Sequence, residues 1–401
     1  MNLGTQRAFD RLLGVPLCAL LSIVDRLLPR RAVGPPRAIL VMLLSEAGAA
    51  VCVQPMLRAL GTRYPEAALY MMVFEKNRGV AELLGLAPSR LITVCDQSLW
   101  AFMSGSWRAI WRLRAARIDT VIDCELFARI SALYSYLCGA SVRVGFHRHT
   151  QEGLYRGSLV NRRVLYNPYT HISLQFLTLA AAIESGTRPL GKEFVLPERV
   201  ELAPIEFDAA ALKGAGERLY ADFPTLRGRR LVLLHAGGGL LPIRAWPLQY
   251  FQELAATLIE EGCAVGVIGL LADRELGQSI VKHCASPYCV DLTGYTATTR
   301  DLMLIFHRAA LLISNDGGPV HFAALTPVAI LVFFGPETPL LYAPLSRRAT
   351  CLFRRLPCAP CVSAYNHRRT PCDGDNRCLK QISVAEALRA AHQLLAETAP
   401  S

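Results

Sequence analysis

The stretch LLISNDGGPVHFAALTPVAILVFFGP, residues 311–336, decides how the rest of the chain is interpreted. It opens on a short apolar run at 311–313, which is typical of a buried parallel strand. A turn with two glycines follows, and Pro319 suits the first turn of a helix because the N–H it lacks would be unbonded there. Thr326-Pro327 ends this predicted helix, and a second strand covers residues 328–334. The pattern predicts a strand–turn–helix–strand unit.

The turn before this helix is a candidate phosphate site. Gly317 and Gly318 let the backbone approach a ligand closely. A helix N-terminus presents unbonded N–H groups and a partial positive charge, and ligands of parallel α/β sheets bind at this edge. An ordinary structural turn has the same glycines, but Asp316 and His321 beside them favour a ligand site.

The composition predicts a globular protein with two α/β domains. At 401 residues the chain exceeds one typical core, and its 52% hydrophobic and 19% charged residues exclude disorder. The net charge of +11 indicates anionic partners. The basic residues are scattered and no nucleic-acid-binding signature accompanies them, so we expect anionic small molecules or lipid headgroups and no nucleic acid.

The cysteine content indicates a reducing compartment. There are 13 cysteines, an odd number, and Cys18, Cys52, Cys138 and Cys263 each stand alone in apolar surroundings. Such thiols behave as small hydrophobic side chains. We therefore expect a cytoplasmic protein.

The amino-terminal segment, residues 8–30, is an apolar helix candidate. Its uncharged run between Arg11 and Asp25 has 13 residues, whereas a membrane span needs about 20. No small-residue cleavage site follows, so a cleaved signal peptide is not expected. Arginines flank the run, so the helix could lie on the inner membrane surface. It could equally pack on the protein's own core.

Alternating strands and helices predict the domain organisation, with parallel βαβ units in both halves. Residues 1–37 form an amphipathic helix and linker, and residues 38–190 a first Rossmann-like domain. Residues 191–228 connect it to a second, 229–401, which contains a Cys-rich segment, 357–379. The predicted strands are 38–44, 68–73, 120–122, 142–145, 230–235 and 264–268, and the predicted helices are 50–63, 299–309 and 384–397.

Three further motifs of the second half follow predicted strands. His235-Ala-Gly-Gly-Gly239 precedes Arg244-Ala-Trp246-Pro247, and glycines with a nearby cation suit a diphosphate. Asp273 follows a strand that ends near Gly269. It could accept hydrogen bonds from nucleoside hydroxyls or cap the following helix. Asp291-Leu-Thr-Gly294 precedes the helix predicted at 299–309.

As an ordered set, these motifs resemble glycosyltransferase family 9, the ADP-heptose:lipopolysaccharide heptosyltransferase-like proteins. Asp316-Gly-Gly-Pro-Val-His321 is similar to the family pattern Asp-Ser/Thr-Gly-Pro-x-His, and Arg244-x-Trp246-Pro247 to its Lys-x-Trp-Pro. Asp291-Leu-Thr-Gly, Phe334-Gly-Pro and the first-domain series Ser45…Gly48…Pro55 stand in the family order. The resemblance covers residues 38 to 395.

The resemblance implies a GT-B fold, with two Rossmann-like domains whose parallel sheets face each other across a cleft. The second domain would hold a nucleotide-diphosphate sugar, ADP-heptose in this family, and the first would receive a lipid-linked glycan. No metal or other cofactor would be required for catalysis. The donor-binding residues implied are Arg244, Trp246, Asp273, Asp316, Gly317, Gly318, Pro319 and His321.

Two positions depart from the family pattern. Gly317 replaces the Ser or Thr of the turn, which removes a hydroxyl donor. Ala49 stands where the family has the Asp that is its usual catalytic base. Because sugar transfer to a hydroxyl needs a base, we expect Glu125, and after it Glu46, to take that role. A helix cap or an exposed loop charge is the other interpretation of each.

Four cysteines in the Cys-rich segment are a candidate structural metal site. Cys358 and Cys361 form a C-x₂-C pair, and Cys372 and Cys378 follow at irregular spacing. Four thiolates bind zinc or hold an iron–sulfur cluster. Reduced or disulfide-paired loop cysteines would give the same sequence.

The sequence therefore predicts a cytoplasmic glycosyltransferase, peripheral on the inner membrane, acting on a lipopolysaccharide-core or other cell-envelope glycan. Ala49 leaves a second interpretation open, a catalytically impaired protein that binds nucleotide sugars. A metal- or redox-responsive regulator built on the Cys-rich segment is a third.

Overall fold

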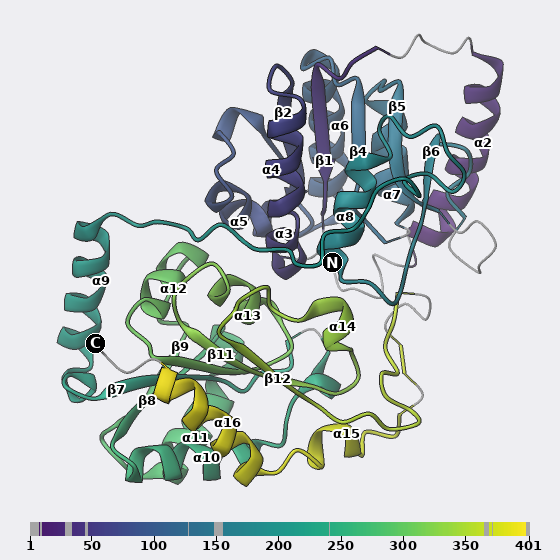
Figure 1. Cartoon of the computed structure of the whole chain (residues 1–401). Coiled ribbons are helices and arrows are strands. Elements are labelled where there is room, and N and C mark those ends of the chain that lie inside the picture. The colour runs from purple at the N-terminus through teal and green to yellow at the C-terminus, as the bar shows by residue number, and fades with distance from the viewer. Residues whose placement is uncertain are drawn as a thin grey trace. The chain divides into compact units, whose positions relative to one another are not determined.

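A computed structural model of the chain describes residues 8, 10–28, 34–44, 47–126, 128–147, 155–239, 241–364, 369–370 and 372–397. The chain divides into two compact units, Met1–Val200 and Glu201–Ser401 (Figure 1). The division falls inside the segment predicted as the connection. Among the described residues, no helix is long and apolar enough to cross a membrane.

The first unit is built on a six-stranded parallel sheet with the strand order β3-β2-β1-β4-β5-β6. Its central strand β1 has the sequence AILVM and is buried along its whole length, as a strand covered on both faces requires. The strands are β1 (Ala38–Met42), β2 (Ala68–Phe74), β3 (Leu91–Val94), β4 (Thr120–Asp123), β5 (Val142–His147) and β6 (Arg162–Leu165).

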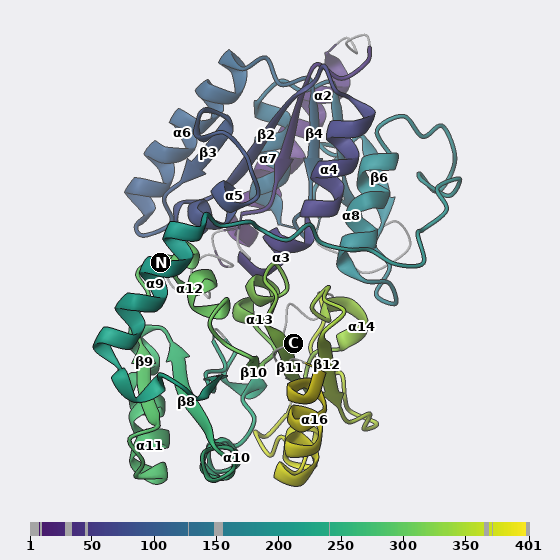
Figure 2. The same ribbon diagram turned by 60° about the vertical axis from the view of Figure 1, so that its left-hand side comes forward.

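Helices cover both faces of this sheet (Figures 1 and 2). One face carries α3 (Ala47–Cys52), α4 (Gln54–Arg63), α5 (Arg78–Leu83) and α8 (Ile172–Ala181). The other carries α6 (Leu99–Ala115) and α7 (Arg129–Leu137), with α2 (Gly14–Leu27) packed against α7. Short 3₁₀ helices at η1 (Glu75–Asn77) and η2 (Pro88–Arg90) complete the connections.

The second unit repeats this topology, with the strand order β12-β11-β10-β7-β8-β9 and all strands parallel. From the first strand, the next two strands extend the sheet on one side and the later three extend it on the other, which is the doubly wound arrangement. The strands are β7 (Arg230–His235), β8 (Cys263–Gly269), β9 (Cys289–Thr293), β10 (Leu311–Asn315), β11 (Ala329–Phe334) and β12 (Ala349–Phe353).

Two helical layers enclose the second sheet (Figure 1). One contains α10 (Leu248–Glu260), α11 (Arg274–Cys284) and α16 (Val384–Glu397), whose apolar faces form one core with the strands. The other contains α12 (Thr299–Phe306) and α13 (Gly318–Ala323), with α9 (Ala209–Asp222) against α12. The remaining helices are α14 (Pro339–Tyr342), α15 (Arg377–Lys380), η3 (Pro224–Leu226), η4 (Pro242–Arg244) and η5 (Leu271–Asp273).

The predicted α/β class with two parallel sheets is confirmed. Strand β7 and helix α16 have the bounds that the sequence predicts. The helix predicted at 50–63 is instead two helices, because Pro55 in the first turn of α4 forces a new start after Val53. The helix predicted at 299–309 ends three residues early, at Phe306.

Candidate functional site

The loops that follow β7 and β10 meet at the carboxyl edge of the second sheet. These two strands pair with each other, while β8 continues the sheet on one side and β11 on the other. The chain therefore leaves β7 and β10 in opposite directions, toward the two faces of the sheet. Ligands of doubly wound sheets bind at this switch point.

Asn315, the last residue of β10, holds three segments together at the switch point. Its Nδ2 donates to the carbonyl oxygens of Ala236 at 2.9 Å and Gly237 at 3.2 Å. Its Oδ1 accepts the N–H of Trp246 at 2.8 Å. The side chain is completely buried, so these bonds fix the loop after β7 and the segment after η4. The sequence analysis assigned no role to this residue.

Trp246 lies beneath the site. Its side chain is 1% exposed, and its indole stacks on Phe333 with the ring centroids 4.3 Å apart. Its Nε1 donates to the Ile382 carbonyl at 2.9 Å, so its one polar atom is already bonded. The residue thus anchors the Arg244–Trp246 segment to the core, and a contact with the donor stays a prediction.

Arg244 lies between two buried carboxylates. Its Nε is 3.5 Å from Asp316 Oδ2, and its Nη2 is 3.7 Å from Glu337 Oε2. The side chains of the three residues are 15%, 6% and 2% exposed, respectively. Carboxylates accept hydrogen bonds from sugar hydroxyls, and a guanidinium donates to phosphate oxygens. That Asp316 contacts the sugar and Arg244 the phosphate stays a prediction.

Glu337 is a site residue that the sequence analysis missed. It follows Phe334-Gly335-Pro336 at the end of β11, the strand beside β10. This position in the sequence could have identified it, because the carboxyl ends of neighbouring parallel strands lie together. The Glu337 side chain is 2% exposed, and burying its charge requires partners that stabilise it. Arg244 is one of these partners.

The turn after β10 has room for a side chain at each of its two glycines. Gly317 has extended backbone angles, φ 178° and ψ −172°. A Cβ placed there would meet nothing nearer than 3.8 Å, and one on Gly318 would lie 3.5 Å from the Phe322 ring. The protein's own packing therefore does not require either glycine. Helix α13 is shorter than predicted, with Pro319 in its first turn and the buried His321 beyond it.

His235 and Asp273 come together on the other side of the switch point. His235 Nδ1 is 3.1 Å from Ser314 Oγ, and burial lowers the pKa of the imidazole while Asp273 opposes that shift. Asp273 accepts the Leu270 N–H at 2.9 Å, across η5, and its side chain makes no capping bond to the following helix α11. Its Oδ1 would be 2.9 Å from a Cβ on Gly237, so that glycine is required.

In the first unit, Glu125 lies at the equivalent switch point, between β1 and β4. It is 8% exposed, and its Oε1 accepts the Leu44 N–H at 2.6 Å. Glu46 lies outside the described residues. Ala49 is in α3 and is buried. The structure therefore places one base candidate at the carboxyl edge, held by the backbone that follows β1.

Asp123 is the innermost carboxylate of this unit. It is completely buried, pairs with Arg156 and accepts from Ser131 Oγ at 2.8 Å. Arg156 Nη1 also donates to the Phe146 carbonyl at 3.0 Å. This network joins β4, β5 and α7 and is structural.

The four cysteines of the Cys-rich segment are free thiols. Cys378 is buried, and burial, then the nearby Cys361 and Cys358, raise the pKa of its thiol. Thr370 Oγ1 donates to Cys361 Sγ at 3.1 Å. Among the described residues, no three His, Cys, Asp or Glu side chains are grouped closely enough to hold a metal ion.

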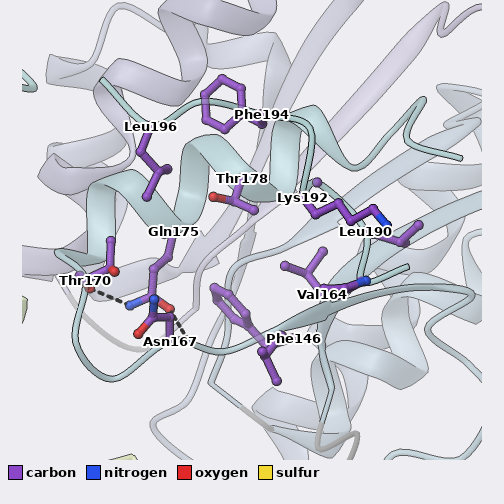
Figure 3. Close-up of a pocket in the computed structure, with 13 residues that line it drawn as sticks. Phe146, Val164, Asn167, Thr170, Gln175, Thr178, Leu190, Lys192, Phe194 and Leu196 are labelled. Atoms are coloured by element: carbon purple, nitrogen blue, oxygen red, sulfur yellow. Dashed lines mark hydrogen bonds between the residues drawn. The ribbon is translucent and has the colours of Figure 1, made fainter. Parts of the chain in front are cut away.

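A hollow of about 200 Å³ lies in the first unit, between β6, α8 and the segment around Leu190 (Figure 3). At one end Gln175 donates to the Thr170 carbonyl at 2.7 Å and accepts from the Asn167 N–H at 3.0 Å. Lys192 lies toward the other end (Figure 3). None of the residues predicted from sequence lines this hollow.

Two doubly wound units with parallel sheets are the domains of a GT-B fold. The chain belongs to glycosyltransferase family 9 (heptosyltransferase), whose pattern matches residues 106–370. The enzyme class expected from the motifs is thereby confirmed.

Individual relatives agree with this assignment. Lipopolysaccharide heptosyltransferase 2 of Salmonella typhimurium is 26% identical over 272 residues, 67% of this chain and 73% of that protein. Lipopolysaccharide heptosyltransferase 1 of Pseudomonas aeruginosa is 26% identical over 298 residues, 71% of this chain and 76% of that protein. The solved structure of E. coli ADP-heptose lps heptosyltransferase II has a TM-score of 0.69, 21% identity, and covers 90% of this chain and 99% of its own. This last likeness supports the fold.

Proposed function

We propose that the protein transfers heptose from ADP-heptose to a lipid-linked acceptor of the lipopolysaccharide-core kind. The two lipopolysaccharide heptosyltransferases it resembles, and the ADP-heptose named for the E. coli structure, support this donor and acceptor. The observation that carries the proposal is the Arg244–Asp316–Glu337 cluster at the switch point of the second unit.

In this proposal, different charged groups bind different parts of the donor. The guanidinium of Arg244 binds the diphosphate and stabilises the negative charge that develops as it leaves. Asp316 accepts hydrogen bonds from sugar hydroxyls, and Asp273 from the nucleoside, on the far side of the Gly237 loop. Gly317 and Gly318 stand at the start of α13, and their backbone N–H groups would donate to the phosphates.

The transfer step forms one bond and breaks one. The acceptor hydroxyl oxygen attacks the anomeric carbon, the bond from that carbon to the diphosphate oxygen breaks, and the nucleoside diphosphate leaves. The hydroxyl proton must go to a base. We assign that role to Glu125 of the first unit, whose carboxylate is kept at the carboxyl edge by the Leu44 N–H. No metal is required in this scheme.

A second candidate is a protein that binds the nucleotide sugar without transferring it. Ala49, in place of the family's Asp, favours it, and the bond that already occupies Glu125 Oε1 does so too. Incubation with ADP-heptose and a heptose-deficient lipopolysaccharide, followed by mass spectrometry, separates the two. Added heptose supports transfer. Saturable donor binding with no product after long incubation supports the second candidate.

We also propose a cytoplasmic location, peripheral on the inner membrane, and a structural metal or iron–sulfur cluster at Cys358, Cys361, Cys372 and Cys378. The acceptor's lipid anchor and the net charge of +11 support the location. Only the sequence pattern supports the metal. Metal analysis of protein purified without chelator tests it, and a clearly substoichiometric content contradicts it.

A further inference from the structure

Helix α2 has its polarity reversed relative to an ordinary surface helix. The narrow strip that packs on the protein contains Gly14, Cys18 and Ser22. Its opposite side is apolar and exposed, with Leu20 at 57%, Ile23 at 55% and Leu27 at 80%. A helix of a globular protein normally buries its apolar stripe and exposes its polar one.

Polar contacts, together with one small apolar contact around Cys18, hold α2 in place. Just before the helix, the Asp10 carboxylate pairs with Arg129 and accepts the backbone N–H groups at the start of α7. Near its end, Asp25 Oδ1 is 2.9 Å from Arg143 Nη2. Ser22 Oγ accepts the Ser158 N–H at 2.8 Å. The apolar side is therefore presented outward by a defined set of bonds.

Helix α6 has a second outward apolar stripe. Trp100, Met103, Trp107 and Trp111 are 78%, 54%, 64% and 59% exposed. At 100° per residue they lie opposite the side that packs on the sheet, which contains Gly105, Ala109 and Leu113. The rings of Trp107 and Trp111 pack edge to face, with their centroids 6.0 Å apart.

The two stripes belong to one layer, because α7 lies between α6 and α2. Ser106 Oγ and Tyr134 Oη are 2.5 Å apart, joining α6 to α7. Cys18 of α2 packs with Ala132 and Leu133 of α7. Thirteen of the twenty exposed large apolar side chains among the described residues are in residues 12–28 and 99–111. We call the outer side of α2, α7 and α6 the helical face.

The charged residues of the helical face favour an anionic partner. Helix α6 contains Arg108, Arg112 and Arg114 and no acidic residue. The acids near α2, Asp10 and Asp25, are neutralised by the ion pairs described above. Exposed tryptophans beside arginines, with leucines pointing outward, are the composition of surfaces at the membrane–water interface.

We propose that the helical face docks on the surface of an anionic lipid bilayer, with the tryptophans of α6 and the leucines of α2 at headgroup depth. Arginines at the rim bind the lipid phosphates. The inference extends the peripheral location proposed above and names the surface responsible. It does not depend on transfer activity.

Tryptophan fluorescence reports directly on this surface. Of the four tryptophans, three are on α6 and the fourth, Trp246, is buried. Vesicles of phosphatidylglycerol and phosphatidylethanolamine should shift the emission of the full chain to the blue, and brominated lipids should quench it. Phosphatidylcholine vesicles should do so weakly. Unchanged emission with anionic vesicles would overturn the proposal.

Vesicle flotation of variants localises the contact. Trp107→Ser/Trp111→Ser and Leu20→Ser/Leu27→Ser should each weaken partition into anionic vesicles by at least about tenfold. The matched control, Tyr169→Ser/Val195→Ser, removes side chains that are 78% and 87% exposed in the same unit and should bind as the wild type. Equal loss in the control would also overturn the proposal.

Two further measurements distinguish membrane docking from self-association of the protein and from a loss of activity. Light scattering should find the same oligomeric state in wild type and variants. A wild-type dimer that the tryptophan variant dissociates, without vesicle binding, would assign the helical face to a second copy of the chain and contradict the proposal. Transfer to a deacylated, water-soluble acceptor should be unchanged in the variants. An inactive wild type in that assay contradicts the proposed function and leaves the vesicle result standing.

Discussion

The switch points of the two sheets have the same topology and different chemistry. Each lies between the first and fourth strands of its unit, where the chain turns away to both sides. In the second unit, Arg244 faces two carboxylates at 3.5 and 3.7 Å, longer than hydrogen bonds. In the first, the Glu125 and Asp123 carboxylates are bonded within the unit. The two switch points therefore share their place in the fold and differ in their charged side chains.

The comparison predicts its largest effect at Asp123, in the first unit. Asp123→Asn leaves the buried charge of Arg156 without its counter-ion. Breaking such a pair costs about 3–5 kcal/mol, so the midpoint of urea unfolding should fall sharply. A variant as stable as the wild type would show that this network is not structural.

Arg244→Ala should strongly lower transferase activity. Loss of the cation at the leaving diphosphate should lower kcat/KM for transfer by about 10²–10³-fold. Arg244→Lys, which restores the family's residue, is the matched control and should retain activity within about tenfold. Unfolding midpoints of the two variants separate a loss of activity from a loss of stability. Full activity of Arg244→Ala would contradict the assignment of the phosphate site.

Glu125→Gln tests the proposed catalytic base in the first unit. The amide oxygen can still accept the Leu44 N–H, so the fold should persist. If Glu125 is the base, kcat should fall by about 100-fold or more while the dissociation constant of ADP-heptose stays constant. Wild-type kcat in this variant would remove Glu125 from the mechanism.

Gly317→Ser is the smallest change and should be tolerated. The site has room for a Cβ, and serine restores the family's hydroxyl. One added hydrogen bond contributes about 0.5–1.5 kcal/mol, so donor affinity should rise by about tenfold at most. Gly237→Ala is the contrast, because its Cβ would clash with Asp273. Weaker donor binding in Gly317→Ser would show that the turn requires glycine.

Local sequence patterns predicted the strands, the loops and most of the charged residues of the second switch point. The apolar run of β7 and the 3.6-residue period of α16 are sufficient for their bounds. The partners could not be predicted. Asn315 bonds residues 69 to 79 positions away, and Trp246 reaches Ile382, 136 positions away. Such contacts depend on tertiary packing.

Helix α6 escaped prediction for a different reason. Its sequence, LWAFMSGSWRAIWRLRA, has apolar residues on all sides, so no amphipathic period marks it. The outward tryptophans that hide the period are the same residues that form the helical face.

Calorimetric titration with ADP-heptose tests the central claim, that the second switch point holds the donor. We predict saturable one-to-one binding to the wild type. Binding to Arg244→Lys should be nearly as tight, and binding to Arg244→Ala at least about 30-fold weaker. Equal affinity in all three proteins, or no binding to the wild type, would contradict the account.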